Sequence, residues 1–495
     1  MAPVPRSLRP EWIRWLLGLT LLTLCSWARW IGTGSLKIDE NYPSEKFGTL
    51  LLLAMCVGWG LSVSGWAEML SRPPQRPRRL AYAGLFIMAF MLPLLSNDIF
   101  SLFAHASLSS QGHDVYTSAR SFPSSAWFSW IGERWRTSPS PYGPVTLVAA
   151  WPSVLGGNNP WLAELFLKLA WLVPLAVVME ISFRVFPDRP TFHGLLWLNP
   201  LFLVEGPGQL HPDLVGVLLI TSGLLMRQRA PGLGGATAWS LATLSKLNLG
   251  FSLPWFWLSG TVTQAQRQRR GLLLLLSLLV WGTVLYIPFW RGPATLVGPL
   301  RAIAANRLVT PSPVVDCVET VVGFLRGEDF FLPKTQPAVA AGQDLEVRAF
   351  VWQVAQGLMQ LLALAAILPL ARSLLRGYNE KRLAFATGAF VVALLTLASP
   401  KFQSWYLMSA LPFFGLSCPP AWRRWWVWVV ATSVTTEFSL ALPPTAMLFS
   451  PCAAITTTAT AVVFLSWFRA RYWELQPQEI QTPLVVERAS LEPQR

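Results

Sequence analysis

Long apolar runs separated by short basic clusters make up most of this 495-residue chain. Many of the runs approach the ~20 residues that a helix needs to cross the ~30 Å hydrocarbon core of a bilayer. Backbone groups within lipid must hydrogen-bond internally, so we expect these runs to be helices. We interpret 233–260 as a hairpin of two crossings. The single spans are predicted at about 11–32, 47–66, 80–95, 161–182, 193–207, 212–226, 271–290, 349–371, 383–399, 403–418, 424–442 and 446–467.

The basic clusters predict how these spans are oriented. Residues 71–79 read Ser-Arg-Pro-Pro-Gln-Arg-Pro-Arg-Arg, and so basic a segment is typical of a cytoplasmic loop. By the same rule, the Arg and Lys residues at 184–189, 227–229, 372–382 and 423–424 are expected on the cytoplasmic side. About fourteen crossings then leave both termini in the cytoplasm.

Two long loops are predicted on the outer face, at about 96–141 and 291–348, and both are expected to carry short helices. The apolar stretch 142–156 is too short for a comfortable span, so we interpret it as a half-inserted helix. The predicted fold is an all-α polytopic membrane protein, with one transmembrane domain over residues 1–467 and a polar cytoplasmic tail over 468–495. The expected location is a cell membrane.

Composition supports this fold class and argues against others. The chain is 53% hydrophobic and 13% charged, whereas soluble domains carry about 25% charged residues. The net charge of +14 comes largely from Arg residues between apolar runs. No basic domain interleaved with aromatic residues is present, so we exclude nucleic acid as a partner. The five cysteines show neither a disulfide framework nor a metal-binding spacing.

Ionisable and aromatic residues occur where the predicted spans meet the outer face. Asp98 follows the third span in Ser-Asn-Asp, where a charge is either functional or simply a hydrated helix end. Tyr116 ends the segment Gly-His-Asp-Val-Tyr, and Tyr142 lies in Pro-Tyr-Gly-Pro, which predicts a sharp turn. Either ring could stack on a sugar or anchor the protein at the membrane interface.

A second group of polar residues lies at turns between short apolar segments. Glu205, His211 and Asp213 fall within nine positions, which predicts a polar cavity at membrane level. Lys246 lies within an apolar hairpin, where it either meets an anion or carboxylate or extends to the interface. A further junction combines a cation, an amide and two aromatic rings: Lys401, Gln403, Trp405 and Tyr406.

In their order and spacing, these motifs resemble those of the GT-C superfamily of membrane glycosyltransferases. They are most similar to the bacterial polyprenyl-phosphomannose-dependent α-1,6-mannosyltransferases, from about the third predicted span to Tyr406. Asp98 stands where that family carries an acidic motif at the start of its first large outer loop. The other similar segments are 112–116, 140–144, 199–200, 211–213, 244–246 and 399–406. The chain departs from the family pattern at Val115, Pro212 and 401–403.

The resemblance implies an inverting glycosyltransferase that acts on the outer membrane face. Its donor would be a polyprenyl-phosphate sugar, with mannose expected, and its acceptor a glycan or glycolipid. Asp98 is expected to be the general base, and His211 and Asp213 to shape the substrate pocket. Cations are expected to stabilise the departing lipid phosphate, with Lys246, Arg120, Arg307 and Lys401 as candidates. We expect Asp98, His211, Asp213 and Lys246 to line one cavity.

The sequence is compatible with a bound cation and with two other classes of membrane protein. Nothing in the sequence requires a metal cofactor, although paired carboxylates such as Asp98 and Asp213 could hold a divalent cation. A transporter or flippase for a lipid-linked glycan would also place charges in broken helices, but we find no inverted repeat. An O-antigen ligase or polymerase would likewise use a polyprenyl-linked donor, and a lipid diphosphate would distinguish that case.

Overall fold

In the computed structural model, all the regular secondary structure of the described residues is helical. No strand occurs in this part of the chain, so the predicted all-α fold class is confirmed there. The described residues are 9–35, 44–117, 127, 130–131, 139–229, 232–258, 263–305, 357, 361, 380–393, 403–418 and 420–440.

Four of the described helices are long and apolar enough to cross a membrane. They are α1 (Pro10–Thr33), α2 (Glu45–Ser71), α6 (Pro160–Val185) and α12 (Gln264–Tyr286). A fifth span arises if Pro200–Gly208 and Asp213–Met226, which meet at 116°, are taken as one bent span. About fourteen crossings stays a prediction, because the predicted span 446–467 and nearly all of 349–371 lie outside the described residues.

Local sequence explains where the long helices begin and end. The Ser44 hydroxyl accepts a hydrogen bond from a backbone N–H in the first turn of α2, and the Asn159 side chain does the same for α6. Thr263 and Gln266 form a capping box at the start of α12. Gly34 ends α1 with a φ of 67°, which glycine adopts without steric cost.

Shorter helices complete the described part of the bundle. In chain order they are α3 (Pro77–Ala89), α4 (Asp98–Ser110), α5 (Pro144–Ala150), η4 (Trp151–Gly156), α7 (Pro190–Leu196), α8 (Pro200–Leu203), η5 (Val204–Gly208), α9 (Asp213–Arg229), α10 (Leu233–Ser245), η6 (Leu247–Ser252), α11 (Leu253–Leu258), η7 (Ile287–Phe289), η8 (Pro293–Val297), α13 (Gly298–Ala305), α16 (Glu380–Ala393), η11 (Ser404–Ala410), α17 (Leu411–Ser417) and α18 (Pro420–Leu440).

Two predicted spans are not continuous helices. The interpretation of 193–207 as one span is wrong, because the Asn199 side chain caps α8 and Pro200 cannot continue α7. The helix predicted over 80–95 ends at Ala89, and a non-helical segment leads from there to α4. Both breaks lie close to motif residues.

Three other predicted segments are helical in the structure, as expected. The hairpin over 233–260 is present, with Lys246 at the turn between α10 and η6. The stretch 142–156 contains two short helices, α5 and η4, so it is not one long span. That this stretch inserts halfway into the membrane stays a prediction. The span predicted over 403–418 consists of η11 followed by α17.

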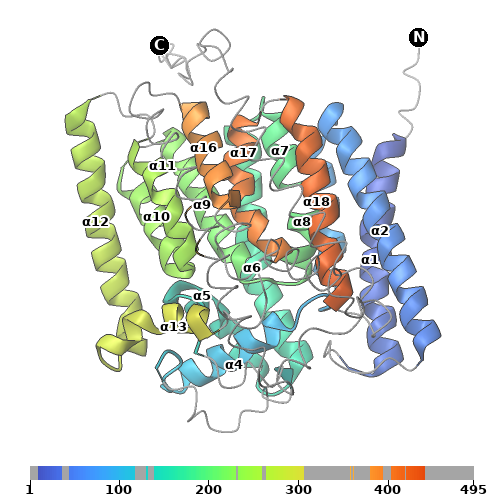
Figure 1. Cartoon of the computed structure of the whole chain (residues 1–495), viewed down its shortest axis with the longest axis horizontal. Coiled ribbons are helices and arrows are strands. Elements are labelled where there is room, and N and C mark those ends of the chain that lie inside the picture. The colour runs from blue at the N-terminus through green and yellow to red at the C-terminus, as the bar shows by residue number, and fades with distance from the viewer. Residues whose placement is uncertain are drawn as a thin grey trace, which may run out of the picture.

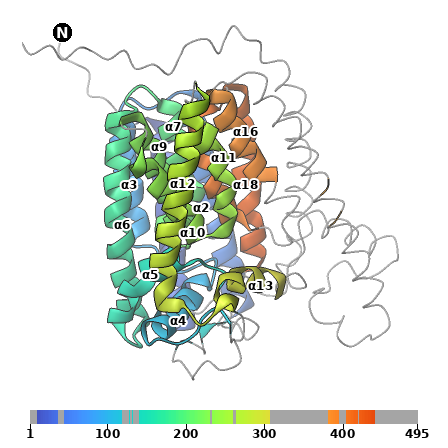
Figure 2. The same ribbon diagram turned by 90° about the vertical axis from the view of Figure 1, so that its left-hand side faces the viewer.

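The short helices α4, α5 and α13 lie across one end of the bundle, as Figure 1 shows. Seen from the side in Figure 2, α12 runs along the bundle and leads to α13 at that same end. Helix α4 belongs to the first predicted outer loop and α13 to the second. The structure therefore brings parts of both loops to one end.

Basic residues from three predicted cytoplasmic segments meet at the opposite end. Arg78 and Arg184 each place a guanidinium nitrogen 2.8 Å from the Glu180 carboxylate. Arg423 donates to the backbone carbonyl of Leu70 at 3.0 Å. These contacts join the start of α3 to the end of α6, and the end of α2 to the start of α18. Which membrane face this end meets stays a prediction.

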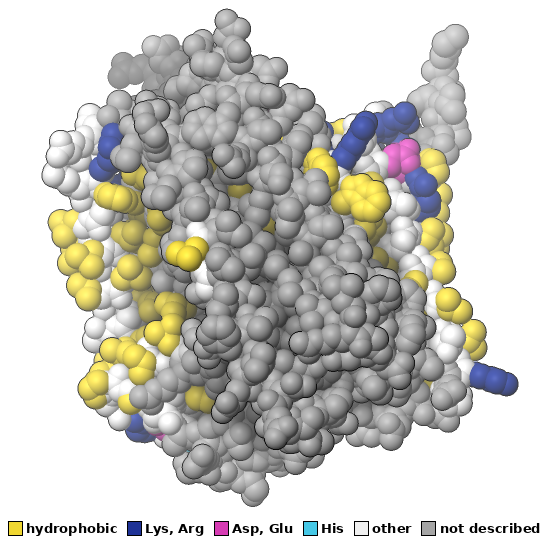
Figure 3. Space-filling model, viewed as in Figure 1, with side chains coloured by type: hydrophobic (Ala, Val, Ile, Leu, Met, Phe, Trp, Pro, Cys, Tyr) yellow, Lys and Arg dark blue, Asp and Glu magenta, His cyan; other side chains and the backbone are white. Residues whose placement is uncertain are grey.

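The sides of the bundle carry the apolar surface that a bilayer requires. On α12, Leu272, Leu275 and Leu279 each expose more than half of their area. Leu50 and Leu53 do the same on α2. In Figure 3, hydrophobic side chains lie along both flanks, and most of the visible Lys and Arg side chains lie toward the upper end. Apolar rows this long are typical of lipid-facing helices.

Candidate active site

Asp98 is the first residue of α4, the helix that lies across one end of the bundle. The segment between α3 and α4, residues 90–97, is non-helical, and we call it the strap. At its end, the backbone N–H of Asp98 donates to the Ser96 hydroxyl at 3.1 Å. Asp98 then occupies the first turn of α4, where the helix dipole favours a carboxylate.

His211 and Asp213 are presented by a break between two helices. The chain leaves η5, a single π turn, and enters α9 at Asp213. Such π turns are frequent at functional sites. Leu210 lies between them with a φ of 51°, in the left-handed region that leucine rarely adopts. The backbone N–H of His211 returns to the carbonyl of Glu205 at 3.0 Å, which fixes the turn.

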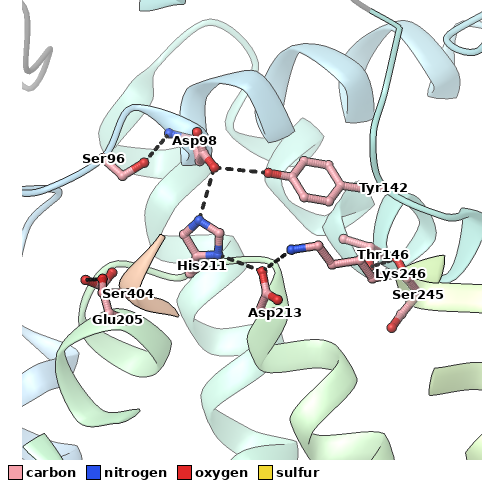
Figure 4. Close-up of polar contacts among 10 residues, drawn as sticks. All are labelled: Ser96, Asp98, Tyr142, Thr146, Glu205, His211, Asp213, Ser245, Lys246 and Ser404. Atoms are coloured by element: carbon pink, nitrogen blue, oxygen red, sulfur yellow. Dashed lines mark hydrogen bonds and ion pairs between the residues drawn. The ribbon is translucent and has the colours of Figure 1, made fainter. Parts of the chain in front are cut away.

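Four predicted site residues form one continuous chain of polar contacts (Figure 4). Nε2 of His211 lies 3.1 Å from Oδ2 of Asp98, and its Nδ1 lies 3.1 Å from Oδ2 of Asp213. Nζ of Lys246 donates to the same Asp213 oxygen at 2.7 Å. The expected proximity of these four side chains is therefore present. That they line a cavity open to the outer face stays a prediction.

Burial differs sharply along this chain of contacts. The Asp98 side chain is 30% exposed, while that of His211 is 2% exposed and that of Asp213 is fully buried. A buried carboxylate is costly unless it is paired, and His211 and Lys246 supply that compensation. Asp98 is thus the carboxylate of the two that a substrate could reach.

Tyr142 contacts Asp98 from the other side. Its phenol donates to Oδ2 of Asp98 at 3.3 Å, and the ring itself is buried. Burial, and next the negative charge of Asp98, raise the pKa of the Tyr142 phenol well above its usual range. Tyr142 therefore remains a hydrogen-bond donor at any physiological pH.

The Pro-Tyr-Gly-Pro turn packs directly against the turn that carries Lys246. The N–H of Gly143 and the hydroxyl of Thr146 both donate to the Ser245 carbonyl, each at 2.9 Å. A Cβ at position 143 would lie 2.0 Å from the Leu244 carbonyl oxygen, so only glycine permits this approach. The motif thus fixes the position of the turn that carries Tyr142 relative to the turn that carries Lys246.

Tyr116 supports this turn rather than facing a substrate. Its side chain is fully buried, and its hydroxyl donates to the Tyr142 carbonyl at 3.0 Å. Its ring packs near those of Tyr286 and Phe289. Stacking of Tyr116 on a sugar face, one of the two alternatives from the sequence, is therefore not what this arrangement favours.

Trp405 and Tyr406 cover the polar chain. The Trp405 ring stacks on the His211 imidazole with centroids 4.0 Å apart and planes inclined by 30°. The Tyr406 ring lies 4.2 Å from Nζ of Lys246, a cation–π contact. Gln403 is buried just before them, and its Oε1 has no hydrogen-bond partner among the described residues.

Glu205 and Ser404 form a second polar contact behind this wall. The Ser404 hydroxyl donates to Oε1 of the fully buried Glu205 at 3.1 Å. This bond ties η11, and with it Trp405, to the π turn that precedes His211. Sequence reasoning placed Glu205 near the cavity but could not identify its partner, because Ser404 follows 199 positions later.

Three predicted phosphate ligands lie outside the described residues: Arg120, Arg307 and Lys401. Among the described residues, no group of three or more His, Cys, Asp and Glu side chains is arranged to hold a metal. The imidazole of His211 lies between Asp98 and Asp213, where the sequence suggested that a cation could bridge the two carboxylates. The Lys246 ammonium compensates Asp213 in this structure.

Comparison with known proteins gives a family for the part of the chain that holds these contacts. Residues 16–261 match the family model described as alpha-(1->6)-mannopyranosyltransferase, N-terminal domain. The chain is 27% identical to alpha-(1->6)-mannopyranosyltransferase A of Mycobacterium tuberculosis, over 54% of this chain and 48% of that protein. It is also 27% identical to alpha-(1->6)-mannopyranosyltransferase B of Corynebacterium glutamicum, over 48% of this chain and 45% of that protein.

These matches have a limited extent. The chain spans about half the length of the curated relatives that it matches. No solved structure matches it. The resemblance that the motifs predicted is nevertheless confirmed, since both relatives carry the same mannosyltransferase description. Asp98, His211, Asp213 and Lys246 all fall within residues 16–261, the part of the chain that matches the α-(1→6)-mannopyranosyltransferase family model.

Proposed function

We propose that this membrane protein is a glycosyltransferase that transfers mannose from a polyprenyl-phosphate donor to a glycan or glycolipid acceptor on the outer face. The observation that carries the proposal is the partly exposed Asp98 carboxylate, held between Tyr142 and His211. The family of residues 16–261 supports the choice of mannose. A carboxylate held in this way suits a general base for an attacking hydroxyl.

The proposed reaction is a direct displacement at the anomeric carbon. The acceptor oxygen forms the new bond to that carbon while its proton passes to Asp98. The bond from the anomeric carbon to the phosphate oxygen breaks, and the lipid phosphate leaves with the electron pair. Because attack and departure take place on opposite faces, a β-linked donor gives an α-glycoside.

The buried neighbours of Asp98 hold its carboxylate in one orientation. Tyr142 donates to Oδ2 of Asp98, and the imidazole of His211 also faces this atom, so both restrict how the carboxylate turns. Trp405 stacks on His211 and limits the movement of the ring. Such fixed geometry keeps the base in a productive position at little entropic cost during the reaction.

The charges of Asp98, His211, Asp213 and Lys246 bear on where the lipid phosphate binds. Asp98, Asp213 and Lys246 together carry one net negative charge, and a protonated His211 brings the sum to zero. This cluster alone does not favour a lipid phosphate, which is itself an anion. We therefore propose that further cations bind the phosphate, and the predicted candidates are Arg120, Arg307 and Lys401. Lys246 has additional N–H donors that are available to the phosphate.

A transfer assay with purified protein tests this proposal. The protein is incubated with a panel of polyprenyl-phosphate sugars and an oligomannoside acceptor, and products are analysed for sugar and linkage. We expect transfer from polyprenyl-phosphate mannose and formation of an α-linkage. Transfer only from a lipid diphosphate would move the protein to the ligase or polymerase class, and no transfer from any donor would contradict the proposal.

One observation keeps a transporter as a second candidate. A carboxylate–imidazole–carboxylate–ammonium chain at a 116° break between helices could also relay protons. Reconstituted vesicles distinguish the two functions. A transporter moves an intact lipid-linked sugar across the bilayer, whereas a glycosyltransferase releases free polyprenyl phosphate on one side.

A further inference from the structure

The strap that leads to Asp98 is held by side chains rather than by secondary structure. Non-helical backbone inside a membrane protein needs partners for its polar groups, because lipid offers none. Side chains of α1, α6 and the turn before α9 supply them. They are Trp27 (to the Phe90 carbonyl, 2.8 Å), Lys168 (to the Met91 carbonyl), Ser26 (from the Leu92 N–H, 3.0 Å), Arg29 (to the Pro93 carbonyl, 3.4 Å) and Gln209.

Gln209 makes three of these contacts with one buried amide. Its Oε1 accepts from the N–H groups of Leu94 and Leu95 at 2.7 and 2.9 Å. Its Nε2 donates to the carbonyl of Leu92 at 3.2 Å. The side chain is 4% exposed, so water cannot easily replace these bonds. Of the side chains that hold the strap, Gln209 contacts the residues nearest to Asp98.

The same residue lies beside His211 in sequence. Gln209 precedes His211 by two positions, and Leu210 with its left-handed φ separates them. On the strap, Leu95 precedes Asp98 by three positions. Asp98 and His211 are therefore connected in two ways. Their side chains are in contact at 3.1 Å, and the backbone segments that carry them are joined by the hydrogen bond from the Leu95 N–H to Gln209.

We propose that Gln209 is a positioning residue that sets the separation between Asp98 and His211. The inference rests on the proposed function insofar as Asp98 is the base. Gln209 does not touch Asp98, and it acts by fixing the strap three residues earlier. The left-handed Leu210 turns the chain so that the Gln209 amide meets the strap while the His211 ring meets Asp98.

Two variants separate positioning from general stabilisation. Gln209→Met keeps the length of the side chain and removes all three bonds to the strap. Trp27→Phe is the matched control, because it removes one bond to the same strap at Phe90, eight positions before Asp98. We expect kcat to fall roughly tenfold to hundredfold in Gln209→Met, since ångström-scale misplacement has effects of this size. The KM for the donor should stay within about threefold, and Trp27→Phe should keep a near-normal kcat.

A double-mutant cycle with Asp98→Asn identifies the residue through which Gln209 acts. If Gln209 positions Asp98, Gln209→Met should cause no further loss of kcat once the carboxylate is gone. Equal losses in both backgrounds, or a normal kcat in Gln209→Met, would overturn the inference. A normal kcat in Asp98→Asn would instead contradict the catalytic role of Asp98, so the two failures are distinguishable.

Hydrogen exchange tests the positioning without any enzymatic assay. In Gln209→Met, the amide protons of Leu94 and Leu95 lose their acceptor, and we expect faster exchange in a peptide that covers residues 92–98. In Trp27→Phe, exchange of this peptide should match the unmodified protein. Unchanged exchange in Gln209→Met would show that the amide does not hold the strap, and the inference would fail whatever the catalytic result.

Discussion

The pairing of Lys246 with Asp213 makes a quantitative prediction about stability. Lys246→Met removes the ammonium that lies 2.7 Å from the Asp213 carboxylate. The Asp213 side chain is fully buried, so water cannot replace the missing partner. Breaking a buried pair on one side typically costs about 3–5 kcal/mol. His211 still contacts the same oxygen of Asp213, so we expect a loss near the lower end, about 3 kcal/mol.

A double variant provides the decisive comparison. In Lys246→Met/Asp213→Asn, both charges are absent, and replacing a buried pair by neutral residues is often close to neutral in free energy. The double variant should therefore recover most of the stability that the single variant loses. It should remain impaired in transfer, because the His211 side chain loses one of its two carboxylate partners. Lys46→Met, at an exposed position in α2, is a matched control without an expected effect.

Thermal unfolding in detergent, followed by tryptophan fluorescence, measures the relative stabilities of the unmodified protein and the variants. The melting midpoint should be lowest for Lys246→Met, and the double variant should lie near the unmodified protein. A single variant that melts like the unmodified protein would show that the pair is energetically unimportant. A double variant less stable than the single would contradict the argument that an uncompensated Asp213 charge causes the loss.

Two further substitutions and one pH experiment test the turn beside the base. Tyr142→Phe removes the donor to Asp98, and we expect kcat to fall about tenfold, the effect of a hydrogen bond to a charged group worth ~1.5 kcal/mol. Because the pKa of Tyr142 is raised, its contribution to stability is present below pH ~10 and is lost only as pH rises further. Stability curves of the protein and of Tyr142→Phe should therefore run parallel up to pH ~10, and divergence at neutral pH would refute this. Gly143→Ala should lower both the melting midpoint and kcat, since the new Cβ would lie 2.0 Å from the Leu244 carbonyl; normal values would show that the turns separate easily.

The grouping of the site residues could be predicted because each lies at a helix junction. Asp98, His211 and Lys246 follow or interrupt apolar segments, and the positive-inside rule assigned all three junctions to one face. A polar side chain at such a place is costly unless it meets a partner, so convergence was the physical expectation. The contacts of Asp98 with His211, and of Lys246 with Asp213, agree with it.

Other features could not be predicted, because they depend on hydrogen-bond partners that are distant in sequence. The strap could not be distinguished from a helix over 80–95, because its backbone groups are satisfied by Ser26 of α1 and by Gln209. Apolar periodicity contains no information about such remote acceptors. The break within 193–207 was in principle readable, since Asn199-Pro200 is a helix-start signal in the middle of an apolar run. The chemistry of the site thus depends on the places where regular helices stop.

The exchange of Asp98 for Asn tests the central claim most directly. The two side chains are nearly isosteric, but an amide cannot take up the proton of the attacking acceptor hydroxyl. Initial rates are measured at saturating polyprenyl-phosphate mannose, with Asp114→Asn as the matched control. Asp114 lies in the same predicted loop, and its Oδ1 accepts backbone N–H bonds that an amide oxygen can also accept.

We predict a loss of kcat of about 10²–10⁴-fold for Asp98→Asn, the usual contribution of a positioned general base. Folding and donor binding should be largely preserved, and Asp114→Asn should transfer mannose at a near-normal rate. Near-normal turnover by Asp98→Asn would show that this carboxylate is only a hydrated helix end, and it would contradict the proposed mechanism.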